Sequence, residues 1–250
     1  MKLKLMAAAA AVALAGGVVA VGAAEMIPSN IAAAVANPGR PAADTARDAA
    51  RKPAEVLAFA HVKPGETVLE LIPGGGYFTR LLSGAVGPTG HVTEAVPLRG
   101  GADMKASSNG VAADPNFTNV SEVAFTPTAV TTAGPVDLVW TSQNYHDLHL
   151  TVLNLDVVGL DKQIYAALKP GGVFFIEDHA DKAGTGISDV NTLHRIDEAF
   201  VKQEVESVGF KLVGESEILR NPADDHSLKV FDPAIRGHTD QFLLKFKKPG

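Results

Sequence analysis

The segment that most constrains the fold is residues 67–83, TVLELIPGGGYFTRLLS. Val68–Ile72 is a short apolar run with a single acid, Glu70, and it is followed closely by three consecutive glycines, Gly74 to Gly76. The residues from Tyr77 onward have helical spacing. Glycine permits a tight strand-to-helix turn and lets a ligand approach the backbone, because it has no Cβ. The segment therefore predicts a strand, a bare turn, and a helix whose first N–H groups are free to bind a ligand.

Strands and helices alternate along the rest of the chain. The predicted strands are Val68–Ile72, His91–Val96, Asn119–Phe125, Val136–Thr141, Val173–Glu177, Lys211–Leu219 and Gln241–Phe246. The predicted helices are 45–60, Tyr77–Val86, Val157–Leu168 and Val190–Val208, and a KPGG turn at 169–172 follows the third. This alternation predicts an α/β fold with a doubly wound, mostly parallel seven-stranded sheet. The last two strands have no helix between them, so the final strand is expected to run antiparallel.

The N-terminus has the pattern of a cleaved export signal. Lys2 and Lys4 precede an uncharged apolar run, and small residues lead up to a predicted cleavage site after Ala24. We therefore expect a signal peptide at 1–24, a flexible leader rich in Ala, Pro and Asn at 25–45, and one domain at 46–250. The mature protein is predicted to be periplasmic or secreted, without stable membrane anchoring. An uncleaved anchoring helix is the alternative.

The charge balance restricts the partners. The chain has 28 acidic and 22 basic residues and a formal charge of −6, which becomes −8 when Lys2 and Lys4 are removed with the signal. Such a chain is a poor binder of polyanions, so we predict no nucleic-acid partner. There is no cysteine, which fits an oxidising compartment, and stability must come from core burial. The oligomeric state is not defined by any pattern.

The acid beside the glycines restricts the ligand. Glu70 would repel a phosphate group, and the Gly-Lys-Ser/Thr sequence of a phosphate loop is absent. An acid and a bare turn favour a nucleoside with an amino-acid tail over a nucleotide. An ordinary tight turn without a ligand is the alternative.

Three motifs resemble class I S-adenosylmethionine-dependent methyltransferases. VLELIPGGGYFTRLLS resembles their first motif, DLVW (Asp137 to Trp140) their fourth strand, and LKPGGVFFIED (Leu168 to Asp178) the entry to their fifth. The element order agrees over roughly residues 50–250. More narrowly, the chain resembles exported, predicted methyltransferases of Gram-negative bacteria that share PGGGYFTR, NYHD and NPADDH. The resemblance implies a Rossmann-like fold, S-adenosylmethionine as cofactor, and an unidentified small-molecule methyl acceptor.

The resemblance also implies cofactor-binding residues, with two departures. The implied residues are Glu70, Gly74, Gly75, Gly76, Tyr77 and Glu94. Ile72 stands where the motif has its first glycine. The second strand lacks the terminal acid that holds the ribose, since Glu94 lies two residues early, about 6–7 Å back along the strand.

A polar cluster, NYHDLH (Asn144 to His149), follows the predicted fourth strand. His146 is a candidate general base oriented by Asp147, because an imidazole titrates near neutrality, and Tyr145 is a candidate pocket wall. A polar loop with capping residues is an equal alternative. Together with His149 and His179 this cluster could bind a divalent metal. No compact ligand motif supports that, so we predict no metal ligands.

Further along the chain, HRIDE (His194 to Glu198) is interpreted mostly as a solvated helix face, with His194, Arg195 and Asp197 as possible cleft residues. The connection 220–240 is long enough to be a lid over a binding site, and an ordinary surface loop is the alternative.

Three functions compete on these observations. Methyl transfer from S-adenosylmethionine is the leading hypothesis. A non-catalytic periplasmic binding or scaffold protein is the alternative, favoured by Ile72, by the missing ribose acid and by an export signal that separates the protein from a cytoplasmic cofactor. A metal-assisted hydrolase with His146 and His179 as ligands is the third. A dinucleotide oxidoreductase ranks last, because it also needs an acid after the second strand.

Overall fold

A computed structural model describes residues 26–97, 110–125, 130 and 132–250. The predicted signal peptide and its cleavage site lie outside these residues. The strands are β1 (Thr67–Leu71), β2 (His91–Pro97), β3 (Val120–Phe125), β4 (Val136–Ser142), β5 (Leu168–His179), β6 (Lys211–Ser216) and β7 (Gln241–Lys247). The helices are α1 (Ser29–Val35), α2 (Ala42–Thr45), α3 (Asp48–Arg51), α4 (Pro53–Ala60), α5 (Tyr77–Val86), α6 (Val157–Ala167) and α7 (Glu198–Ser207), with short 3-10 turns η2 (Val111–Ala113), η3 (His146–His149) and η4 (Thr151–Leu153). No helix in the described ranges is long and apolar enough to cross a membrane.

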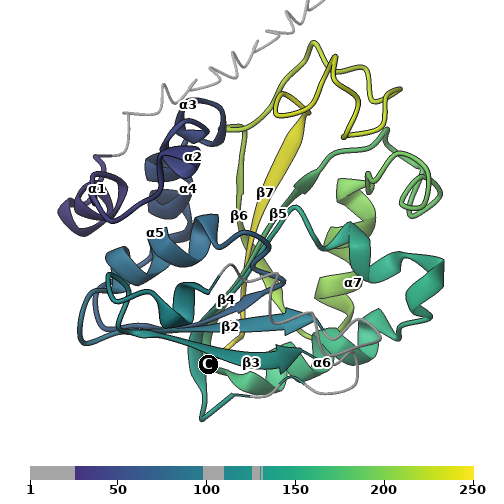
Figure 1. Cartoon of the computed structure of the whole chain (residues 1–250). Coiled ribbons are helices and arrows are strands. Elements are labelled where there is room, and N and C mark those ends of the chain that lie inside the picture. The colour runs from purple at the N-terminus through teal and green to yellow at the C-terminus, as the bar shows by residue number, and fades with distance from the viewer. Residues whose placement is uncertain (1–25, 98–109, 126–129, 131) are drawn as a thin grey trace, which may run out of the picture.

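All seven strands form one sheet in the order β3-β2-β1-β4-β5-β7-β6 (Figure 1). β1 to β5 pair in parallel, and β7 pairs antiparallel with both β5 and β6. The prediction of a mostly parallel, seven-stranded sheet with an antiparallel final strand is confirmed. The strand order reverses between β1 and β4, and ligands of such sheets bind beyond the carboxyl ends of the strands at that reversal.

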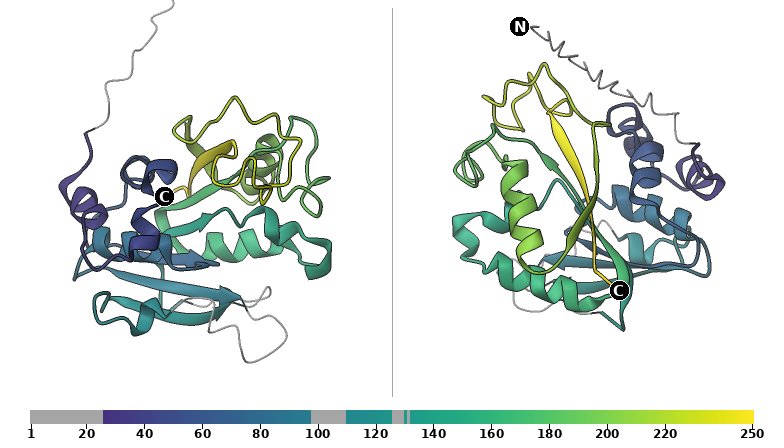
Figure 2. Two further views of the ribbon diagram at one scale, coloured as in Figure 1. Left: turned by 45° about the horizontal axis from the view of Figure 1, so that its top comes forward. Right: turned by 180° about the vertical axis from the view of Figure 1, so that it is seen from behind.

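Helices cover both faces of the sheet, as Figures 1 and 2 show. One hydrophobic cluster joins α1, α4 and α5 to inward residues such as Val68 and Leu138, and the other joins α6 and α7 to Leu69 and Val139. The alternation follows from the period of two along a strand. The fold is therefore doubly wound, and the two cores leave only the strand ends open.

The N-terminal segment is more ordered than expected. The predicted flexible leader 25–45 contains α1 and α2 within the described residues, and Ile31 and Ala34 are buried. α1 packs closely on α5, because a Cβ at Gly84 would lie only 2.9 Å from the Cβ of Ala34. The leader prediction is wrong in this respect: its alanines pack against a helix, and they do not mark a loose chain.

Three predicted boundaries also differ. The helix expected over 45–60 breaks at Lys52, whose backbone is left-handed (φ 42°), and Pro53 restarts it at the first position of α4, as predicted. The KPGG turn at 169–172 is part of β5 and forms an irregularity in its pairing with β4. The helix expected from Val190 begins only at Glu198, since Asp197 caps it by accepting a hydrogen bond from the Ala199 N–H.

Candidate functional site

The glycine turn connects β1 to α5 at the point where the strand order reverses. Gly74 and Gly76 have left-handed backbones (φ 56° and 75°), and a Cβ at Gly76 would lie 2.4 Å from Val111 Cγ2. A cavity of about 200 Å³ opens beside this turn. Its lining includes Glu70, Gly74, Gly75 and Tyr77 from β1, the turn and α5, and Ser142, Gln143 and Asn144 from the end of β4. The structure thus brings most of the predicted cofactor residues together around one cavity.

Ile72 lines the same cavity in an unusual conformation. Its φ is 54°, in the left-handed region that β-branched residues rarely adopt. Asn144 Nδ2 donates a hydrogen bond to the Ile72 carbonyl oxygen at 2.9 Å, which ties the turn to the segment after β4. The backbone here keeps the shape that glycine adopts freely, although the side chain is bulky.

Two arginines form the cationic side of the cavity. Arg47 and Arg51 line it, and their guanidinium carbons lie 4.6 and 4.5 Å from the centroid of the Tyr77 ring. The Tyr77 hydroxyl donates a hydrogen bond to Asp48 Oδ1 at 2.7 Å, so the ring is fixed under α3. Sequence analysis missed both arginines. Their i, i+4 spacing, which places them on one helical face, was the available signal.

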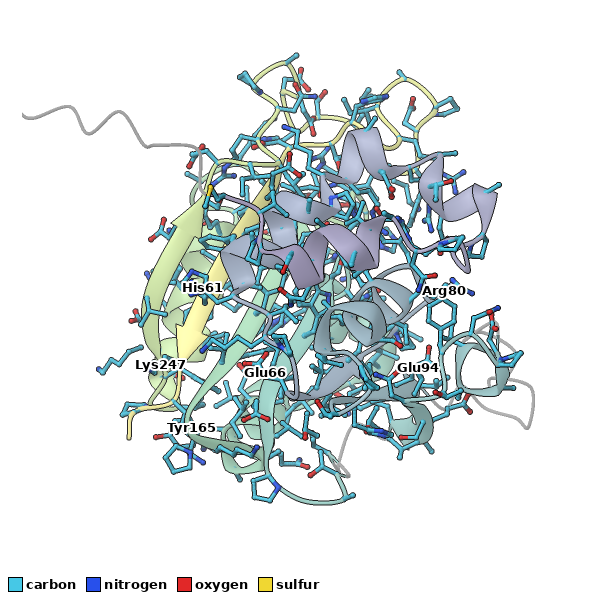
Figure 3. The ribbon with its side chains drawn as sticks, turned by 90° about the vertical axis from the view of Figure 1, so that its left-hand side faces the viewer. His61, Glu66, Arg80, Glu94, Tyr165 and Lys247 are labelled. Carbon is cyan, nitrogen blue, oxygen red and sulfur yellow. The ribbon has the colours of Figure 1, made fainter. Side chains whose placement is uncertain are left out.

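Glu70 and Glu94 face each other through Thr79, directly below the turn. The Thr79 hydroxyl lies 2.6 Å from Glu70 Oε2 and 3.0 Å from Glu94 Oε1, and all three residues are buried. Burial raises the pKa of Glu70 to about 8 and that of Glu94 to about 7. Glu70 also lines the cavity, whereas Glu94 is fully buried beneath it, on the side of α5 that carries Arg80 (Figure 3). Cofactor binding by Glu94 remains a prediction that this placement does not favour.

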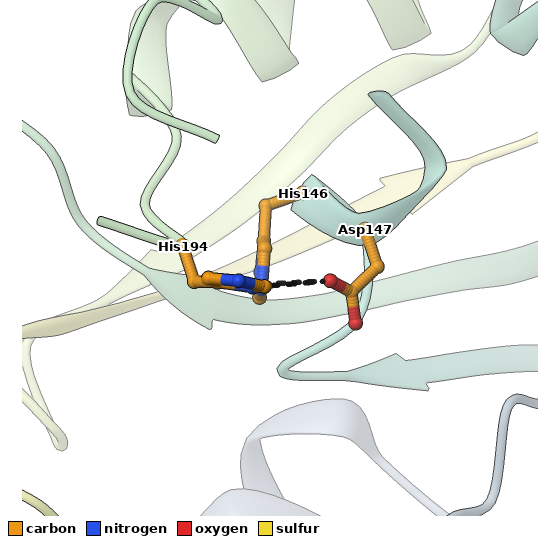
Figure 4. Close-up of side chains that lie close together, drawn as sticks. All are labelled: His146, Asp147 and His194. Carbon is orange, nitrogen blue, oxygen red and sulfur yellow. Dashed lines mark ion pairs between the residues drawn. The ribbon is translucent and has the colours of Figure 1, made fainter. Parts of the chain in front are cut away.

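His146 lies beyond the end of β4, between two carboxylates. Its Nδ1 is 2.7 Å from Asp178 Oδ1, and its Nε2 is 3.2 Å from Asp147 Oδ1. Burial alone would lower the pKa of His146, but these two carboxylates outweigh it and raise the pKa to about 10. Such an imidazole keeps its proton at neutral pH, so this arrangement does not suit the predicted general base. His194 also contacts Asp147, at 3.4 Å, and completes a cluster of three side chains (Figure 4).

Tyr145 points away from the cavity and into the core between β4, α6 and α7. It is fully buried, and its hydroxyl lies 2.8 Å from both Asp161 Oδ2 and Glu204 Oε1. His149 turns to the same side, with Nε2 2.9 Å from Glu204. The proposed pocket-wall role of Tyr145 is therefore wrong, because residues 144 to 146 project in different directions from a tight turn.

The connection after β6 is fixed to the sheet by a buried arginine. Arg195 is fully buried, and it forms an ion pair with Asp224 at 2.9 Å and donates to the Ala180 and Leu228 carbonyl oxygens. Its role is structural, because it holds the connection against the end of β5 through Asp224 and the Leu228 carbonyl oxygen.

A larger cavity, of about 450 Å³, lies at the opposite end of the sheet. It is lined by residues that include His61, Glu66 and Lys247 (Figure 3). It adjoins the amino ends of β4 and β5, where ligands of this architecture do not bind. The cavity at the glycine turn lies at the carboxyl ends of β1 and β4, where the strand order reverses, and is therefore the candidate site.

Comparison with solved structures defines the class of fold. A methyltransferase from Aquifex aeolicus described as SAM-dependent superposes with a TM-score of 0.56 and 18% identity, over 78% of this chain and 88% of that one. The N-methyltransferase NodS from Bradyrhizobium japonicum gives 0.53 and 14%, over 86% and 98%. The [4+2]-cyclase SpnF gives 0.55 and 16%, over 89% and 93%.

These identities show the fold alone, and the fold is that of the S-adenosylmethionine-dependent methyltransferases. No protein-family model and no curated protein matches the sequence. Since SpnF is named as a cyclase, the reaction must be argued from the site and not from the fold.

Proposed function

We propose that this protein binds S-adenosylmethionine at the glycine turn and transfers its methyl group to a small-molecule acceptor. The observation that carries the proposal is the composition of the cavity. A bare turn, a buried acid and two guanidinium groups meet at the place where the strand order reverses. An amino-acid tail carries one ammonium and one carboxylate, so it needs both kinds of partner.

The residues divide the work of positioning. Arg47 and Arg51 lie where a carboxylate would be held, and Glu70 faces the cavity as the acceptor for an ammonium group. The glycine turn lets the ligand approach the backbone. The bound cofactor supplies an electrophilic methyl group on a sulfonium, and methyl transfer needs mainly alignment with the acceptor. The cavity has a volume of about 200 Å³, which is less than a pocket for the whole of S-adenosylmethionine would need. It therefore suits the methionine end of the cofactor.

Titration calorimetry of the full chain with S-adenosylmethionine and with its demethylated product tests the proposal. We expect micromolar binding that weakens at least tenfold in Gly74→Val. Gly237→Val is the matched control, because Gly237 is also left-handed (φ 81°) and also has open space around its Cβ position, but lies outside the candidate cavity. No binding to the folded wild type, or equal losses in both variants, would refute the proposal.

A non-catalytic binding protein with the same fold is the second candidate. The strained Ile72 and the ending of β2 in Pro97, without an acid, favour it. Tight cofactor binding with no demethylated product formed over a broad panel of acceptors would support this candidate. Export of the protein is part of both proposals, and N-terminal sequencing of mature protein from a periplasmic extract would test cleavage after Ala24.

A further inference from the structure

Three side chains with metal-binding atoms meet beyond the end of β4. His146 and Asp147 come from η3, and His194 comes from the turn before α7. One ligand atom from each residue can be chosen so that all three lie within 4.8 Å of one another. Figure 4 shows the two imidazole rings close together beside the carboxylate of Asp147. This group lies two residues beyond Asn144, which lines the cavity.

The separations resemble those in a metal coordination shell. Asp147 Oδ1 lies 3.2 Å from His146 Nε2 and 3.4 Å from His194 Nδ1. Zinc binds nitrogen and oxygen at about 2.0–2.2 Å, so neighbouring ligands of a tetrahedral ion lie roughly 3.3–3.5 Å apart. Two edges of the tetrahedron are therefore already close to their final length. We propose that His146, Asp147 and His194 form a binding site for a divalent cation of the zinc type.

The first ligand, His146, is already oriented for a metal, which on binding would displace the proton from its Nε2. Asp178 Oδ1 holds its Nδ1 at 2.7 Å, which leaves Nε2 directed at the site. Asp178 is itself fixed, because it accepts hydrogen bonds from the backbone N–H groups of His146 and His179, both at 2.7 Å. A buried carboxylate behind a ligating histidine is the usual outer-shell partner that fixes the ring and its tautomer.

The second histidine has a buried nitrogen without a well-aligned hydrogen bond and has a strained backbone. His194 Nδ1 is buried and makes no hydrogen bond to any described residue, although Asp147 is near. The φ of His194 is 56°, a left-handed conformation that persists only where neighbouring contacts impose it. The contacts are hydrogen bonds from the His194 N–H to the Asp189 carbonyl oxygen and from the Val230 N–H to the Leu193 carbonyl oxygen, both at 3.1 Å. A coordinated cation would satisfy this nitrogen better than its 3.4 Å contact with Asp147 Oδ1 does.

The site can accept a further ligand. The side chains of Asp147 and His194 are 25% and 18% exposed, so one side of the group is open to solvent. Two imidazoles and one carboxylate suit zinc and similar transition ions better than magnesium or calcium, which prefer oxygen ligands. Three protein ligands with an open fourth position are typical of catalytic rather than structural zinc. The proposal is independent of methyl transfer, because it concerns the cation alone.

Zinc titration of the untagged full chain, without S-adenosylmethionine, tests the site. We expect one ion per chain, a raised melting temperature, and a visible spectrum of imidazole coordination when Co²⁺ replaces Zn²⁺. His194→Asn should weaken zinc binding at least 100-fold, and asparagine tolerates the left-handed backbone. Asp178→Asn should weaken it by about 10- to 100-fold, as expected for an outer-shell partner.

His238→Ala is the matched control, because His238 is exposed and distant in sequence from all three ligands. It should bind zinc like the wild type. Asp147→Asn provides a second ligand variant should His194→Asn fail to fold. Less than one bound zinc in the wild type, or unchanged affinity in a folded ligand variant, would refute the site. In that case the three side chains form only an ion-paired network.

Discussion

Two pairs of carboxyl groups are each bridged by one hydroxyl but lie in different surroundings. The Thr79 hydroxyl bridges Glu70 and Glu94 below the glycine turn, and the Tyr145 hydroxyl bridges Asp161 and Glu204 between α6 and α7. A hydroxyl has one proton to donate, so in each pair one carboxyl must itself be protonated to make the second hydrogen bond. Burial accordingly raises the pKa of Glu70, Glu94 and Asp161.

The difference lies in access. Glu70 lines the candidate cavity, whereas Tyr145 and Asp161 are completely buried in the core. A ligand can therefore change the charge state of the first pair, while the second pair can only contribute to stability. Identical chemistry thus supports binding in one place and packing in the other.

Removing the Tyr145 hydroxyl, which bridges Asp161 and Glu204, should have the largest effect on stability. Tyr145→Phe leaves the buried Asp161 and the partly buried Glu204 without their shared donor, and we expect a loss of about 3 kcal/mol in the free energy of unfolding, with cofactor binding unchanged. Urea unfolding measures it. Tyr165→Phe is the control, because Tyr165 is only half-buried, and it should change stability by less than about 0.5 kcal/mol. Similar losses in both variants would contradict the bridging role.

Glu70 and Glu94 should make the protein less stable as pH rises. A carboxyl whose folded pKa lies above its unfolded value holds its proton better in the folded state, so its stabilisation is full below the unfolded value of 4.5 and is lost as pH rises to about 8. We expect Glu94→Gln to reduce this fall by roughly 1–3 kcal/mol. Unfolding at pH 5 and pH 8 would measure it, with the exposed Glu217→Gln as control. Identical slopes in all three proteins would show that Glu94 does not titrate in this way.

Ligand affinity should depend on the arginines that line the cavity and not on arginines elsewhere in the protein. Arg51→Ala removes a guanidinium from the cavity wall, and we expect S-adenosylmethionine to bind about tenfold more weakly, or about 1.4 kcal/mol. Arg236→Ala, in the exposed connection before β7, should bind like the wild type. Calorimetry compares the two. Equal affinities would remove Arg51 from the site.

The smallest effect is expected at the strained turn. Ile72→Gly relieves a left-handed β-branched residue, which costs about 1–2 kcal/mol, and this gain offsets the lost burial of the side chain. Stability should change by less than about 1 kcal/mol, and cofactor affinity should rise about threefold as the cavity widens. Ile187→Gly, at a position without a positive φ, should only destabilise. A fall in affinity for Ile72→Gly would mean that the isoleucine contacts the ligand.

The strands and the glycine turn were predictable because their signals are local. Apolar runs bounded by Gly and Pro fixed β1 and β4 to within one residue, and the predicted Tyr77–Val86 helix matches α5. Glu70 and Ser142 line one cavity because parallel strands end at the same edge of a sheet.

The remaining features depend on contacts between distant residues. Leu193 and Ile196 have helical spacing, yet the chain at these positions is not helical and α7 begins only at Glu198. In this conformation the buried Arg195 forms its ion pair with the distant Asp224. His194 contacts Asp147 through the same non-helical segment. The sequence therefore pointed to His146 and Asp147 but not to their contact with His194. The arginines at the cavity were missed because their i, i+4 spacing shows only that they share a helical face, and tertiary packing decides that this face meets the glycine turn.

The place of the final strand determines when the molecule can be completed. β7 lies between β5 and β6, and β6 pairs with no other strand in the described sheet. During synthesis β6 therefore emerges before its partner, and the sheet remains open until β7 has been added. A chain that ends before Gln241 leaves one edge of β5 and all of β6 unpaired.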